Sequence, residues 1–170
     1  MLIAASLALT VARTTGRVSV LDLGAIYGPL HGDWWRVIAA PFVHDNLGYQ
    51  FVTLLAVGVF GSALERRFDW YVTLLLFVAA GAAGCGAAVA AQTWPTLGAN
   101  GAALGLLTAW VVEYRLGRND GDADLIGAGV FAAVLFLLSA AWQPASIAAA
   151  LGGTAIGALG GFALAQRRGV

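Results

Sequence analysis

The sequence predicts an all-α membrane protein, a bundle of six transmembrane helices with a first loop lying in the membrane interface. Two observations indicate this class. Of the 170 residues, 60% are hydrophobic and 11% charged, with a mean hydropathy of +0.82, whereas about a quarter of the residues in soluble domains are charged. In addition, long stretches contain no charged residue at all. We therefore expect one transmembrane domain, residues 1–170, with the lipid bilayer as its main partner.

The first apolar segment, residues 2–12, is short for a spanning helix, which needs roughly 20 residues. We expect it to tilt, to thin the bilayer locally, or to continue a segment that begins before Met1. No basic residue precedes this segment. A cleavable signal peptide is therefore not expected.

Residues 13–43 form the longest predicted loop, which mixes aromatic residues and prolines with polar residues. This composition suits a structure that lies in the membrane interface rather than free in water. The residues that indicate it are Tyr27, Pro29, Trp34, Trp35, Pro41 and Phe42.

Beyond the loop, residues 46–64 are free of charge and fit one helix. Residues 70–112 and 125–166 are also charge-free, and each is about twice as long as one spanning helix requires. Both contain tryptophan close to proline near the middle, at Trp94-Pro95 and at Trp142 to Pro144, which favours turns at the membrane surface. The expected helices are residues 47–64, 70–91, 98–114, 125–142 and 145–165.

The distribution of arginines predicts the orientation. With six helices and a cytoplasmic N-terminus, six arginines fall in cytoplasmic segments and three in the outer first loop, as the positive-inside rule requires. We therefore expect an integral protein of a bacterial cell membrane with both termini cytoplasmic. The inner arginines are Arg66, Arg67, Arg115, Arg118, Arg167 and Arg168, and the outer ones are Arg13, Arg17 and Arg36.

The net charge of zero gives no indication of nucleic-acid binding. Cys85 is the single cysteine, so it cannot form a disulfide within the chain. No pattern of histidines and cysteines suggests a metal ion, and we expect no cofactor.

Glycines recur at four-residue spacing on two predicted helices. Gly153, Gly157 and Gly161 share one face of the last helix, and Gly101 and Gly105 repeat the pattern on the helix near residue 98. Small residues at this spacing allow helix backbones to approach closely in membranes. We expect these glycines to act in helix packing.

Three stretches together resemble the rhomboid family of intramembrane serine proteases in their order and spacing. The first is WWR at residues 34–36 with PFVH at 41–44, followed by LERRF at 64–68. The others are GANGAALGLL at 98–107, similar to the family's GxSG helix, and AALGGTAIG at 149–157, similar to its last helix. This resemblance covers essentially the whole chain and implies a six-helix fold.

In the family, the serine of GxSG attacks the substrate and a histidine of the last helix takes its proton. The resemblance puts Asn100 at the serine position and Ala150 at the histidine position. Neither side chain can do this chemistry, and losing such a group typically costs about a millionfold in rate. The sequence therefore predicts a protein without an intact catalytic site.

The resemblance also implies further positions around the substrate cavity. The family has two histidines and an asparagine at the start of its second helix, of which the later two help to hold the oxyanion. Here the first is kept, and the others are a tyrosine and a threonine. The implied cavity and oxyanion positions are His44, Tyr49, Thr53, Gly98 and Asn100.

These features favour a non-catalytic pseudoprotease that binds transmembrane segments or other membrane proteins. The alternative is an active intramembrane serine endopeptidase with a different dyad, for which Ser146 and His44 are the candidates. A transporter or channel is a third hypothesis. The absence of charges from residues 70–112 and 125–166 speaks against it, because such proteins usually carry buried charges along their path.

Overall fold

The computed structural model describes residues 1–16, 18–117 and 125–168, and in these residues it is all-α, as predicted. Arg17 and Arg118 lie outside the described residues. An isolated antiparallel bridge pairs Ile26 with Thr96. The helices are α1 (Leu2–Thr14), α2 (Trp35–Ala39), η1 (Ala40–Phe42), α3 (Leu47–Glu65), α4 (Trp70–Ala90), α5 (Asn100–Leu116), α6 (Leu125–Ala141), η2 (Gln143–Ala145) and α7 (Ile147–Arg168).

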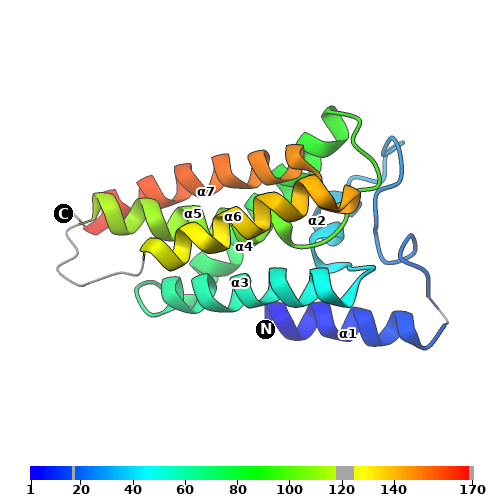
Figure 1. Ribbon diagram of the computed structural model, residues 1–170, viewed down its shortest axis with the longest axis horizontal. Coiled ribbons are helices and arrows are strands. Elements are labelled where there is room, and N and C mark those ends of the chain that lie inside the picture. Colours follow the sequence, from blue (N-terminus) through cyan, green and yellow to red (C-terminus); the bar gives the residue numbers. More distant parts are fainter. Residues whose placement is uncertain (17, 118–124, 169–170) are drawn as a thin grey trace.

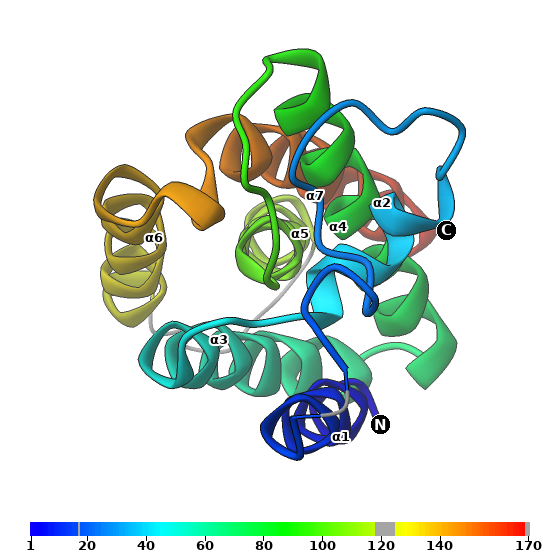
Figure 2. The same cartoon turned by 90° about the vertical axis from the view of Figure 1, so that its right-hand side faces the viewer.

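The long helices run side by side, with α2 and the first loop at one end of the bundle (Figure 1). Seen along the bundle, α5 lies in the centre and is surrounded by α3, α4, α6 and α7, all of which it contacts (Figure 2). Helix α1 lies on the outside, against α3. The start of α5 therefore faces several elements at once.

Three helices of the described residues are long and apolar enough to cross a membrane, namely Leu47–Glu65, Trp70–Ala90 and Ile147–Arg167. Helices α1 and α6 are apolar but shorter. The expected count of six spans and the interfacial position of the first loop remain predictions.

Two helices begin later than the sequence analysis expected. Helix α5 starts at Asn100 rather than at residue 98, because Gly98 has a φ of +94°, outside the helical region. Helix α7 starts at Ile147 rather than at residue 145, because residues 143–145 form the 3-10 turn η2. Ser146 then caps α7, its hydroxyl oxygen accepting a hydrogen bond from the Ala149 nitrogen at 3.4 Å.

The glycines of α5 and α7 set the distance between these two helices. A Cβ atom on Gly153 would overlap the carbonyl oxygen of Gly101, and one on Gly157 would overlap that of Gly105. The two backbones therefore touch directly, because glycine has no side chain to separate them.

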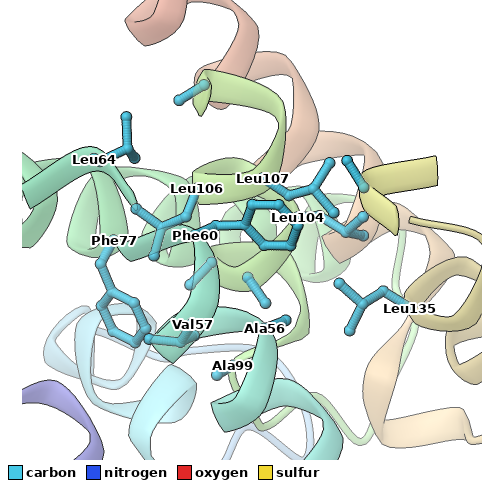
Figure 3. Packing of buried hydrophobic residues seen from close by; sticks show 14 of the residues in the cluster. Ala56, Val57, Phe60, Leu64, Phe77, Ala99, Leu104, Leu106, Leu107 and Leu135 are labelled. Atoms are coloured by element: carbon cyan, nitrogen blue, oxygen red, sulfur yellow. The ribbon is translucent and has the colours of Figure 1, made fainter. Parts of the chain in front are cut away.

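A cluster of buried apolar side chains surrounds the middle of α5 (Figure 3). Phe60 of α3 contributes to it and also contacts the rings of Trp110 and Phe131, with centroids 5.6 and 5.5 Å apart. Near the end of α5, Arg67 forms a 2.7 Å ion pair with Glu113, whose side chain is fully buried. The ion pair fixes the α3–α4 turn to α5.

Candidate functional site

The candidate site lies at the start of α5. Asn100, in the first turn, is 1% exposed. Its Nδ2 donates a hydrogen bond to the Ser139 hydroxyl of α6 at 2.6 Å, and it lies 3.5 Å from the carbonyl oxygen of Ala145. Asn100 Oδ1 has no hydrogen-bond partner among the described residues. The Asn100 side chain therefore connects α5 to α6.

Ala150, which the resemblance puts at the family's base position, is fully buried in α7. The first turn of α5 lies against this part of α7, because a Cβ on Gly101 would come within 2.7 Å of the Ala149 carbonyl oxygen. Positions 100 and 150 thus lie on facing turns of α5 and α7. A methyl group at position 150 accepts no proton.

His44, in the turn before α3, is 2% exposed and makes hydrogen bonds through both ring nitrogens. Its Nε2 accepts from the backbone N–H of Ala99 at 3.2 Å. Because a backbone N–H can only donate, the proton of the neutral ring belongs on Nδ1, which lies 3.1 Å from the Ser6 hydroxyl. Burial lowers the pKa of His44 to about 4. The ring is therefore neutral near pH 7.

The network around His44 extends to α1. Ser6 donates to the carbonyl oxygen of Phe42 at 2.9 Å and accepts from Gln50 Nε2 at 3.2 Å. Gln50 also donates to the Thr10 hydroxyl at 2.8 Å. Ser6 and Thr10 are the buried residues of α1, so this helix is attached mainly through hydroxyl groups. The sequence analysis missed both residues, although their four-residue spacing places them on one helix face.

Tyr49 and Thr53 complete this side of the site. The Tyr49 hydroxyl donates to the Leu97 carbonyl oxygen at 3.3 Å. A Cβ on Gly98 would overlap the Tyr49 ring, so glycine is required there. Thr53 Oγ1 lies 3.2 Å from His44 Nε2 and also donates within α3, to the Tyr49 carbonyl at 3.0 Å.

The structure thus brings four of the five predicted cavity positions together around the backbone of residues 97–99. These are His44, Tyr49, Thr53 and Gly98. The side chain of the fifth, Asn100, bonds to α6 instead. The N–H of Ala99 is occupied by His44, so that donor is not free to bind an oxyanion.

The alternative pair, Ser146 and His44, shares no hydrogen bond. Ser146 Oγ lies 2.7 Å from Thr93 Oγ1 and caps α7. Both nitrogens of His44 bond to other groups. Among the described residues, no group of three or more His, Cys, Asp or Glu side chains is placed to hold a metal ion.

Comparisons with a family model and with three known proteins all indicate the rhomboid family. Residues 31–167 match the family model of the Rhomboid domain. The chain is 25% identical over 108 residues to "RHOMBOID-like protein 9, chloroplastic" of Arabidopsis thaliana. These aligned residues cover 60% of this chain and 25% of the relative. It is 33% identical over 78 residues to "Rhomboid protease GluP" of Bacillus subtilis, covering 46% of this chain and 15% of the relative.

A third relative is "Rhomboid-type serine protease 2" of Emericella nidulans, 29% identical over 94 residues that cover 54% of this chain and 19% of the relative. The matches thus span a quarter or less of the length of these three relatives. No solved structure gives a significant match to the chain.

The fold and the apolar helices define a helical integral membrane protein with several candidate spans. The match over residues 31–167 identifies its family, and the chain belongs to the rhomboids.

Proposed function

We propose that this chain is a rhomboid pseudoprotease that binds transmembrane segments of other membrane proteins without cutting them. The observation that carries the proposal is the chemistry at the two dyad positions. Asn100 offers an amide bonded to Ser139, and Ala150 offers a buried methyl group. A serine protease needs a nucleophile within hydrogen-bonding reach of a base. The Asn100 amide is not such a nucleophile, and the Ala150 methyl group is not a base.

The contacts of the oxyanion positions support the same proposal. His44 takes the N–H of Ala99, and Tyr49 lies against Gly98 and bonds to Leu97. Stabilising an oxyanion requires preorganised donors that are directed at the developing charge. Here His44 and Tyr49 bond to backbone groups of Ala99 and Leu97, which favours a structural role for these positions.

The proposal includes the expected topology. A single domain with six spans would use α1, α3, α4, α5, α6 and α7, with both termini cytoplasmic. Helices α1, α5 and α6 have 13, 17 and 17 residues and are short for this, and a short span is accommodated by local thinning of the bilayer. The bacterial cell membrane remains an expectation, since the relatives come from a plant, a bacterium and a fungus.

The experiment that tests the proposal combines serine labelling with a cleavage assay. The chain is reconstituted in proteoliposomes and treated with a fluorophosphonate probe, beside an active rhomboid protease as positive control. We expect no labelling and no cleavage of transmembrane substrates, while fluorescently labelled transmembrane peptides bind. Substrate cleavage by the wild-type chain, abolished by Ser146→Ala or His44→Ala, would instead establish the alternative dyad.

A further inference from the structure

A cavity of about 570 Å³ lies between α1, α3 and α4. Along α3 it extends from Val57, in the middle of the helix, to Glu65 at the end, which is about 12 Å at the rise of an α-helix. None of the candidate-site positions described above lines it. Sites for small molecules typically measure about 300–1,000 Å³. This cavity is therefore large enough to hold part of a ligand of its own.

The wall of the cavity is mostly apolar but includes an unpaired hydroxyl group. Thr73 of α4 is 1% exposed, and its Oγ1 has no hydrogen-bond partner among the described residues. A buried hydroxyl group without a partner is unfavourable, because it has lost its water and gained nothing in exchange. Thr73 thus leaves a hydrogen bond available to a molecule in the cavity.

The wall also includes one carboxylate. Glu65 is exposed, and its side chain is the only charged one among the described residues that line the cavity. It forms no ion pair within the described part of the chain. A positively charged group on a ligand would complement it.

A second cavity, of about 560 Å³, lies between α1 and α3 and differs in chemistry. No charged side chain of the described residues lines it, and its Gln50 already donates to the hydroxyl groups of Ser6 and Thr10. The two cavities have nearly the same volume. Only the first one therefore offers polar groups that can select a ligand.

The order of these groups along the cavity fits a phospholipid. Helix α4 is long and apolar enough to cross a membrane, and Trp70 at its start is exposed, as is typical of aromatic residues at the level of the lipid headgroups. Thr73 lies about 4.5 Å further along the helix axis. The ester groups of a phospholipid follow its headgroup in the same direction, and the acyl chains follow the esters.

We propose that this cavity binds an aminophospholipid. One acyl chain fills the apolar part, an ester carbonyl oxygen accepts a hydrogen bond from the Thr73 hydroxyl, and the protonated amine of the headgroup lies beside Glu65. Each part of the lipid then meets a group of matching chemistry in the wall of the cavity.

The headgroup is tested by native mass spectrometry of the full chain in detergent micelles. Phosphatidylethanolamine, phosphatidylcholine and phosphatidylglycerol with identical acyl chains are titrated one at a time. Choline has a positive charge but no N–H donor, and glycerol has neither. We expect phosphatidylethanolamine to bind about 2–5-fold more tightly than either, the size expected of an exposed ion pair.

Glu65→Gln should abolish this headgroup preference. Asp69→Asn is the matched control, because Asp69 lies in the same turn between α3 and α4 but does not line the cavity, and it should keep the preference. Equal binding of the three headgroups by the wild type, tightest binding of phosphatidylglycerol, or a preference that survives Glu65→Gln would overturn the inference.

The ester contact is tested with an ether-linked phosphatidylethanolamine, which has the same headgroup and chains but no carbonyl acceptor. The wild type should bind the ester form about 2–10-fold more tightly, as one hydrogen bond predicts. Thr73→Val should bind both forms equally. Thr154→Val is the control, since the Thr154 hydroxyl already donates to the Ala150 carbonyl oxygen at 2.8 Å, and it should keep the difference. Equal binding of the two forms by the wild type, or a difference that survives Thr73→Val, would also overturn the inference.

Discussion

The Nε2 atom of His44 lies 3.2 Å from the backbone nitrogen of Ala99 and accepts its hydrogen bond. Ala99 immediately precedes Asn100, which the resemblance puts at the family's nucleophile position. His44 thus occupies a backbone donor next to the start of α5. Four predictions follow from this arrangement and from the packing around it.

Restoring the dyad alone should not restore proteolysis. The double variant Asn100→Ser with Ala150→His supplies a nucleophile and a base. The Ala99 N–H remains bonded to His44, however, and Tyr49 remains packed on Gly98. We expect no cleavage of a transmembrane substrate by the folded variant, with folding checked by its thermal unfolding midpoint. Cleavage at a rate near that of an active rhomboid would show that these contacts do not matter.

Removing the Ser6 hydroxyl should loosen α1. In Ser6→Ala, His44 Nδ1 and Gln50 Nε2 lose a shared acceptor in a buried site. The expected loss is about 1–3 kcal/mol in the free energy of unfolding, measured in detergent micelles. Thr14→Ala is the control, because that exposed hydroxyl bonds only to the Val11 carbonyl, and it should change stability by less than about 0.5 kcal/mol. Equal effects of the two variants would contradict the network.

Stability should fall on acidification because of His44. Its pKa is lowered to about 4 in the folded protein, from an ordinary value of 6.5. Between these values the unfolded chain binds the proton and the folded chain does not. The free energy of unfolding therefore does not depend on His44 protonation above pH 6.5. Between pH 6.5 and pH 4 it falls by roughly 1.4 kcal/mol for each unit of decreasing pH. Comparing unfolding of the wild type with His44→Asn isolates this effect, and parallel pH profiles would refute it.

Adding a methyl group between α5 and α7 should be severely destabilising. A Cβ on Gly153 would overlap the Gly101 carbonyl, which is backbone and cannot rotate away. We expect Gly153→Ala to cost about 1–3 kcal/mol or more in the free energy of unfolding. Gly86→Ala in α4 is the matched control. A Cβ there meets nothing within 4 Å, and alanine is the better helix former by about 1 kcal/mol.

The outline of the fold could be predicted from the sequence because lipid imposes simple rules on composition. Charge-free blocks and tryptophan–proline breaks indicated an all-α protein, which the structure confirms. The family was also correctly indicated, since its motifs occur in order along the chain. The number of spans was harder to predict, because α1, α5 and α6 are too short for length alone to decide.

The partners within the site could not be predicted in the same way. Asn100 was singled out by its place in a motif, but its bond to Ser139 joins residues 39 positions apart. Ser6 and Thr10 look like ordinary small residues of an apolar helix until α3 is placed beside them. Such contacts depend on how helices are rotated against one another, and local sequence patterns do not determine this rotation.

The direct backbone contact between Gly101 and Gly153 has one more consequence. Each glycine is close in sequence to a dyad position, Gly101 directly after residue 100 and Gly153 three residues after residue 150. The separation of the helices is set by main-chain atoms, whatever side chains stand at positions 100 and 150. The spacing of α5 and α7 is thus independent of the side chains at these two positions, so a substitution at either of them leaves the two helices in place.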